Sequence, residues 1–186
     1  MAAPATEGTA PRRGLLRRML HAALLRADLY EEVEADRGAN SQALAVVVLA
    51  GLATGVGALE NSGAVGLPWH AAVDVVGWYA WAWITWLVGT RLLPTPETHA
   101  DHGELLRTLG FASAPGLLRA FALIDPLAFP LFTLCTLWMA AAMVVAVRQA
   151  LDYRSTARAA LVCAFGFPIY ALGQLLSVLV LGPWPL

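Results

Sequence analysis

Asp74 and Arg119 are the charged residues of this chain whose surroundings could give them chemistry. Each lies well inside a long apolar stretch, where an ionisable side chain is costly and by default marks an ion or substrate pathway, or a partner charge. Asp74 follows the start of one stretch by five residues and Arg119 precedes the end of the next by a similar number. Counting 1.5 Å of rise per helical residue, both therefore lie at a similar depth below the same membrane surface. We therefore predict an intramembrane ion pair between them. A substrate or proton site built on this pair, and snorkelling of Arg119 to the interface, are the alternatives.

Trp78 and Trp81 share one helical face with Asp74, at spacings of four and seven residues. This face could line a pocket for a lipid, a quinone or a pigment, and Gln174 is a further polar group that could line it. Packing of the indole rings against other helices or lipid tails is the other interpretation.

His99, Asp101, His102 and Glu104 lie close enough together to be considered as metal ligands. However, Asp101 followed three residues later by Glu104 is also an Asp version of the capping box that starts a helix. We favour the cap and predict no metal site and no cofactor. The chain has no Gly-x-Ser-x-Gly, His-Glu-x-x-His or phosphate-loop motif, so we expect that it is not an enzyme.

Five long apolar stretches must position these residues. The chain is 59% hydrophobic and 13% charged, against about 25% charged in an average soluble domain. A hydrocarbon core of about 30 Å needs roughly 20 apolar residues of helix to cross it. The sequence thus predicts an all-α integral membrane bundle of five transmembrane helices within residues 42–181. The predicted spans are Gln42–Leu59, Trp69–Leu92, Glu104–Ile124, Pro126–Val147 and Ala157–Leu181.

The part of the chain before the spans divides in two. Residues 1–13 are predicted to be a disordered tail. Residues 14–36 have apolar side chains at helical spacing, which predicts one amphipathic helix. This helix could lie on the inner leaflet or pack under the bundle, and the sequence favours neither.

Arginine residues indicate the orientation, because basic residues near the ends of membrane spans mark the cytoplasmic side. They gather before the first span, between spans two and three, and between spans four and five, whereas residues 60–68 and 182–186 have none. The N-terminus is therefore predicted to be cytoplasmic and the C-terminus to be outside. The net charge of −1 gives no reason to expect nucleic acid as a partner.

Prolines and glycines indicate how the spans are shaped. Pro115 and Pro168 each remove a backbone donor, so the third and fifth spans are predicted to be kinked. Gly51, Gly55 and Gly57 in the first span permit close approach of another helix. Packing within the bundle and a dimer interface use the same pattern.

The segment from Glu104 to Pro115 resembles the hallmark of the Yip family, the Ypt/Rab-interacting membrane proteins and their prokaryotic relatives. The match consists of Leu109, Gly110, Phe111 and Pro115 inside a predicted span. The resemblance implies five membrane spans with a cytosolic N-terminus. Because the N-terminal region is short, the chain looks more like the prokaryotic branch, which would place it in a cytoplasmic membrane, and Rab binding is not implied.

These observations predict a non-enzymatic integral membrane protein that acts as an adaptor or accessory subunit. Its expected partners are the lipid bilayer and a membrane protein or a second copy of the chain. The alternative is a small transporter or channel that uses Asp74 and Arg119. Against it, five spans cannot form two equal inverted repeats, which is a common transporter plan.

Overall fold

The structure, a computed structural model, describes residues 14–182. The predicted disordered tail, residues 1–13, lies outside the described residues. Within the described range the chain forms helices and connecting segments and contains no strand, so the predicted all-α class is confirmed.

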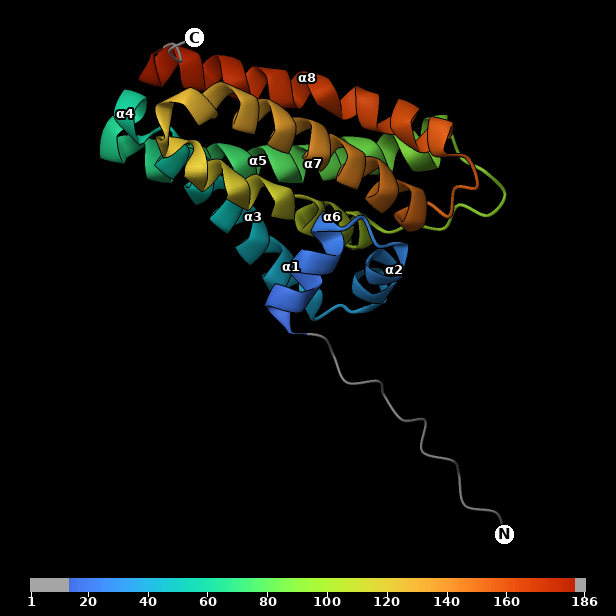
Figure 1. Ribbon diagram of the computed structural model, residues 1–186. Helices are drawn as coiled ribbons and strands as arrows, with labels where there is room; N and C mark the ends of the chain where they lie inside the picture. Colours follow the sequence, from blue (N-terminus) through green and yellow to red (C-terminus); the bar gives the residue numbers. More distant parts are fainter. Residues whose placement is uncertain (1–13, 183–186) are drawn as a thin grey trace.

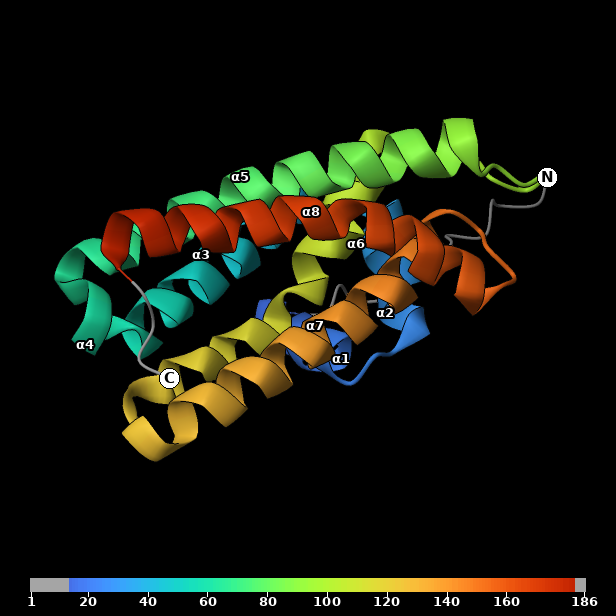
Figure 2. The ribbon, with the colours of Figure 1, turned by 90° about the horizontal axis from the view of Figure 1, so that it is seen from above.

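Four parts of the chain are long and apolar enough to cross a membrane, by length and composition. Their helices lie side by side (Figures 1 and 2). They are α3 (Ala39–Gly57), the stretch Leu59–Leu92 that contains α5 (Gly66–Leu87), α7 (Ala128–Ala150) and α8 (Thr156–Leu181). α3 and α5 run in opposite directions, as do α7 and α8, whereas α5 and α7 run in the same direction (Figure 1).

The third predicted span is not one long helix. Glu104–Ile124 divides into α6 (His102–Ala112) and the 3₁₀-helix η3 (Ala114–Leu123). Pro115, in the first turn of η3, lacks an N–H and its ring would clash with a carbonyl one turn earlier, so an α-helix cannot pass through it undistorted. The described residues therefore contain four long apolar helices and this divided segment, which together run the length of the bundle (Figure 1).

Pro168 lies inside α8, which continues to Leu181, and the kink expected there stays a prediction. Short elements join the long ones: α4 (Leu59–Ser62), η1 (Gly63–Val65), the π-helix η2 (Val88–Leu92) and η4 (Asp125–Leu127). We call the end of the bundle with α4, the start of α7 and the end of α8 the α4 end (Figure 1). Residues 93–101 and 151–155 connect helices at the opposite end.

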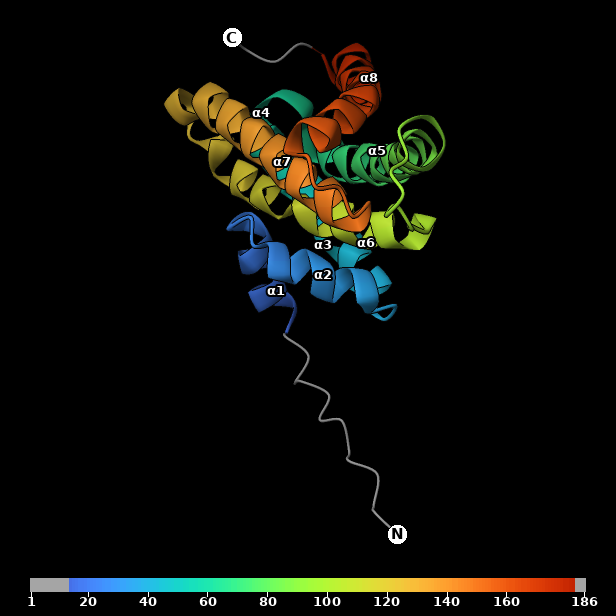
Figure 3. The same cartoon turned by 90° about the vertical axis from the view of Figure 1, so that its right-hand side faces the viewer.

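The predicted amphipathic helix of residues 14–36 is instead two helices, α1 (Leu15–Ala23) and α2 (Ala27–Ala35). The chain turns at Leu25, whose φ of 57° lies in the left-handed region, where an L-residue other than glycine cannot continue a helix. Both helices form a layer beneath the bundle (Figure 3). One face of α1 is buried, while Leu16, Leu20 and Leu24 on the other are exposed.

Arg18 links the layer formed by α1 and α2 to α3 of the bundle. Its guanidinium donates hydrogen bonds to Glu32 (3.0 Å), Asp36 (2.9 Å) and the Gln42 side-chain oxygen (2.9 Å). The side chain is 1% exposed, so these charge-assisted bonds are shielded from solvent. α1, α2 and α3 thereby share one ionic junction.

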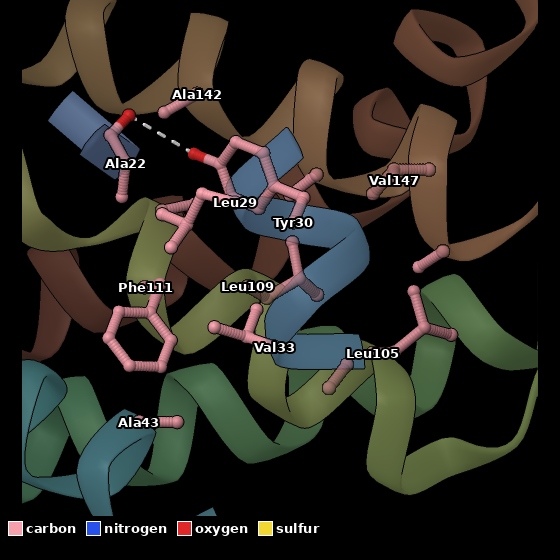
Figure 4. Packing of buried hydrophobic residues seen from close by; sticks show 14 of the residues in the cluster. Ala22, Leu29, Tyr30, Val33, Ala43, Leu105, Leu109, Phe111, Ala142 and Val147 are labelled. Atoms are coloured by element: carbon pink, nitrogen blue, oxygen red, sulfur yellow. Dashed lines mark hydrogen bonds between the residues drawn. The ribbon is translucent and has the colours of Figure 1, made fainter. Parts of the chain in front are cut away.

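The main core lies between α2, α3, α6 and α7, toward the opposite end (Figure 4). The Tyr30 hydroxyl donates to the Ala22 carbonyl oxygen at 3.2 Å, which satisfies the polar end of an otherwise apolar buried ring. Leu105, Leu109 and Phe111 bring α6 into the same cluster.

Glycines mark the closest approaches between helices. A Cβ atom at Gly51 would lie 2.6 Å from Ala71 Cα, and one at Gly55 would lie 2.7 Å from Leu67 Cα. The small face of α3 therefore packs on α5, which favours internal packing over a dimer interface. At Gly57 a Cβ would lie within 3.0 Å of the η3 backbone.

Candidate ligand-binding site

A cleft of about 380 Å³ lies at the α4 end between α4, η3, α7 and α8, within the range of small-molecule sites. Phe129 and Phe132 give it aromatic walls. Its polar lining comes from Thr136, Tyr170 and Gln174, as well as from Glu60 and Asn61 of α4. We refer to this feature as the cleft.

A second, smaller cavity of about 70 Å³ lies between α3, α5, η3, α7 and α8. We refer to it as the pocket. It is lined by residues that include Asp74, Trp78, Trp81, Arg119, Tyr170 and Gln174. Tyr170 and Gln174 line both cavities, so the two are neighbouring compartments. The structure thus brings the five residues singled out from the sequence, Asp74, Trp78, Trp81, Arg119 and Gln174, to one place.

Arg119 lies at the boundary between the two compartments. Its guanidinium donates to Thr136 Oγ1 at 2.8 Å and to Thr54 Oγ1 at 3.4 Å, and it lies over the Phe132 ring, 5.3 Å from the centroid. The side chain is 3% exposed. Within residues 14–182 its Nε is buried and has no hydrogen-bond partner, so this cation keeps an unused donor atom.

The predicted direct ion pair between Asp74 and Arg119 is not formed. Among residues 14–182, the Asp74 carboxylate is in no salt bridge within 4.0 Å and accepts no hydrogen bond. Two threonine hydroxyls and an aromatic ring hold the Arg119 guanidinium instead. Both residues line the pocket, and their common depth in the membrane stays a prediction.

The two indoles of the pocket are held differently. Trp78 Nε1 donates to the Leu106 carbonyl oxygen at 3.0 Å, which ties its ring to α6. Trp81 Nε1 is buried and has no hydrogen-bond partner within the described range. Its ring packs on Gly166, where a Cβ atom would overlap with Nε1. The pocket therefore has fixed aromatic walls and a second unused donor.

The residues of the Yip-like motif shape the bundle around the pocket. Leu109 lines the pocket. A Cβ at Gly110 would lie 2.7 Å from that of Ala43, so α6 approaches α3 closely there. Phe111 is buried in the core, and Pro115 begins η3.

The capping box is confirmed. Asp101 Oδ1 accepts from the Glu104 backbone N–H at 2.8 Å, and Glu104 Oε2 accepts from that of Asp101 at 2.7 Å. Both carboxylates are thus engaged in starting α6. Residues 14–182 bring no three His, Cys, Asp or Glu side chains together as a metal site would need.

The chain was compared with family models, curated proteins and solved structures. No family model, curated protein or solved structure matches this chain. A functional proposal therefore rests on the cleft and the pocket, together with the patterns in the sequence.

Sequence reasoning missed Thr54, Thr136 and Tyr170. Thr136 connects the two compartments, because it accepts from Arg119 and lies 3.4 Å from the Tyr170 hydroxyl. Its only sequence signal is a hydroxyl inside an apolar stretch, which is weak because such a hydroxyl can bond to its own helix. Thr136 does so too, donating to the Phe132 carbonyl oxygen.

A second group of ionisable residues lies at the opposite end and was also missed. Burial raises the pKa of Glu34 to about 7, and the nearby carboxylates of Glu104, Asp152 and Glu31 add to this rise, while Arg107 opposes it. Arg107 donates to the Glu34 carbonyl oxygen rather than to its carboxylate. The Glu34 carboxyl group is therefore held among like charges.

We expect this group to make the protein less stable as pH rises. The folded-state pKa of Glu34 exceeds its ordinary value of 4.5, so the folded protein binds the proton more tightly than the unfolded one. The stabilisation is complete below about pH 4.5 and is lost as pH passes about 7. Thermal unfolding in detergent at pH about 5.5 and about 8.5 should give the higher Tm at the lower pH. Glu34→Gln should shrink this difference, and an unchanged difference would contradict the assignment to Glu34.

Proposed function

We propose that the protein is a non-enzymatic integral membrane protein that binds a membrane lipid between η3, α7 and α8, and acts through it as an adaptor or accessory subunit. The cleft is the observation that carries this proposal. Its aromatic walls suit acyl chains, while Thr136, Tyr170 and Gln174 suit a polar headgroup. The Yip-like motif from Leu109 to Pro115 supports the accessory role, and a membrane-protein partner or second copy belongs to the same proposal.

Five crossings with a cytoplasmic N-terminus form part of the proposal. α6 and η3 would together make the third crossing, and the α4 end would face outside. Positive charge supports this orientation, because Arg91, Arg148 and Arg154 lie toward the opposite end and residues 58–68 contain no basic side chain. The exposed leucines of α1 would then meet the acyl chains of the inner leaflet.

The orientation is tested by cysteine labelling. Ala64, in η1 directly after α4, and Ser155, in the connection between α7 and α8, are both exposed. They therefore mark opposite ends of the bundle. After both native cysteines, which are buried, are replaced, a cysteine at Ala64 should react with a membrane-impermeant maleimide on intact cells. One at Ser155 should react only after permeabilisation. The reverse pattern would overturn the orientation.

The lipid proposal is tested by filling the cleft. Thr133 lines the cleft, whereas Leu134, the next residue of α7, does not and is exposed. Thr133→Trp should reduce the lipid that remains bound after detergent purification to the background level, because the indole occupies the space of the acyl chains. Leu134→Trp is the matched control and should retain the wild-type amount, as measured by native mass spectrometry. Equal retention in both variants would refute lipid binding in the cleft.

A transporter is the second candidate, because Asp74 and Arg119 line a cavity inside the bundle. It requires substrate-dependent flux through liposomes that is lost in Asp74→Asn. Lipid retention without flux favours the accessory role.

A further inference from the structure

The cleft and the pocket lie next to each other, and the pocket reaches Asp74. The cleft is lined by exposed residues such as Phe129 and Leu137, and the pocket by buried ones such as Arg119. Tyr170 and Gln174 belong to both linings. A long molecule could therefore place its apolar part in the cleft and a small polar group in the pocket.

Going from the cleft into the pocket, the side chain of Arg119 is met before that of Asp74. Arg119 comes first, since it contacts Phe132 and Thr136 of the cleft and also lines the pocket. Its Nε is fully buried and has no hydrogen-bond partner within residues 14–182, and its other hydrogen bonds go to neutral hydroxyls, so the positive charge of the guanidinium is left to attract an anionic phosphate. Asp74 follows, because it lines the pocket and not the cleft. Arg119 would therefore form a site for an anion, and Asp74, further into the pocket, a site for a cation.

The cation site has the chemistry that recognises an ammonium group. Asp74 supplies a carboxylate that accepts no hydrogen bond within residues 14–182. Trp78 and Trp81 line the same pocket, and indole is the aromatic ring that attracts cations most strongly. The hydrogen bond from Trp78 to Leu106 holds one of these rings in place. A volume of about 70 Å³ has room for a few atoms, which suits a primary ammonium and its adjoining methylene groups.

We propose that the ligand is a zwitterionic aminophospholipid of the phosphoethanolamine type, with its phosphate at Arg119, its ammonium at Asp74 and its acyl chains in the cleft. This inference rests on the proposed function and names the headgroup. An anionic phospholipid without an amine would satisfy Arg119 and leave the Asp74 carboxylate unpaired in the pocket. A neutral lipid would leave both charges unpaired, which is costly inside a bundle.

The test compares two lipids with the same acyl chains and the same phosphate. Delipidated protein in detergent is titrated with dioleoyl phosphatidylethanolamine or dioleoyl phosphatidylglycerol, and occupancy is measured by native mass spectrometry. The phosphatidylethanolamine should bind about tenfold more tightly, since one shielded ammonium–carboxylate contact is worth about 1.4 kcal/mol or more. Asp74→Asn should abolish this preference. The matched control is Asp152→Asn at the opposite end, where the residue is exposed and has a φ of 52° that asparagine tolerates.

The outcomes separate the headgroup from the cleft. Equal binding of the two lipids, with binding still lost in Thr133→Trp, would overturn the headgroup assignment and leave the proposed function standing. Retention of neither lipid by the wild-type protein would overturn both. Displacement of bound lipid by an equal concentration of free phosphoethanolamine would show that the site binds a soluble zwitterion. That result would overturn the lipid assignment.

Discussion

Replacing Arg119 with glutamine is expected to lower the free energy of unfolding by about 3 kcal/mol. The guanidinium joins α3 to α7 through Thr54 and Thr136, and hydrogen bonds from a charged donor contribute about 1.5–3 kcal/mol each. The substitution also leaves the Asp74 carboxylate without its nearby positive charge. Unfolding of the purified protein by SDS in mixed micelles, followed by circular dichroism, measures the loss.

Three further variants give this prediction its controls. Asp74→Asn should cost less than Arg119→Gln, because Asp74 makes no hydrogen bond within the described residues that the change would remove. The double variant should recover part of the Arg119→Gln loss, and strict additivity would show that the two charges do not interact across the pocket. Arg154→Gln removes an exposed pair with Glu97 and should be nearly neutral. A loss there as large as at Arg119 would refute the argument from burial.

Replacing Gly51 with alanine is expected to destabilise the bundle strongly, although alanine is the better helix former by about 1 kcal/mol. The new Cβ would lie 2.6 Å from Ala71 Cα and 2.9 Å from the His70 carbonyl oxygen. These are backbone atoms, so α3 and α5 must move apart, and such overpacking typically costs about 1–3 kcal/mol or more. Thermal unfolding in detergent should show a Tm several degrees lower.

Gly77 of α5 offers the matched control. It too lies in a long apolar helix, but a Cβ there would meet no atom within 4 Å. Gly77→Ala should therefore keep or slightly raise the Tm. Equal effects at the two glycines would mean that helix propensity, and not the contact between α3 and α5, decides the outcome.

Much of the fold follows from local patterns in the sequence. Long apolar runs predict α3, α5, α7 and α8 because hydropathy and length are properties of one segment. The start of α6 could be predicted as well, since the capping box of Asp101 and Glu104 needs only four residues.

The structure departs from the predictions where contacts between residues distant in sequence determine the local conformation. No sequence pattern in residues 14–36 predicts the turn at Leu25. That turn lets Arg18 reach Glu32, Asp36 and Gln42, partners that are distant in sequence. Pro115 predicted a disturbance of the third span, but not the ten residues of 3₁₀-helix that follow it, because helix type there depends on packing against α3 and α7.

The candidate site shows the same division. Helical spacing placed Trp78 and Trp81 on the face of Asp74, and residue counting placed Arg119 at a similar depth, and all four line the pocket. The partners of Arg119 could not be predicted, because Thr54 and Thr136 lie on other helices. Distance along the chain gives depth in a bundle but not which way a long side chain turns.

The contact between Gly51, Gly55 and α5 bears on how variants of this protein would behave in a cell. Since the small face of α3 is already occupied by the chain itself, a bulky residue there acts on folding before it can act on any assembly. A loss of about 1–2 kcal/mol can change cellular abundance several-fold through quality control. Substitutions at these glycines should therefore be expected first to lower the amount of protein in the membrane. A loss of assembly in such a variant is meaningful only after it has been normalised to that amount.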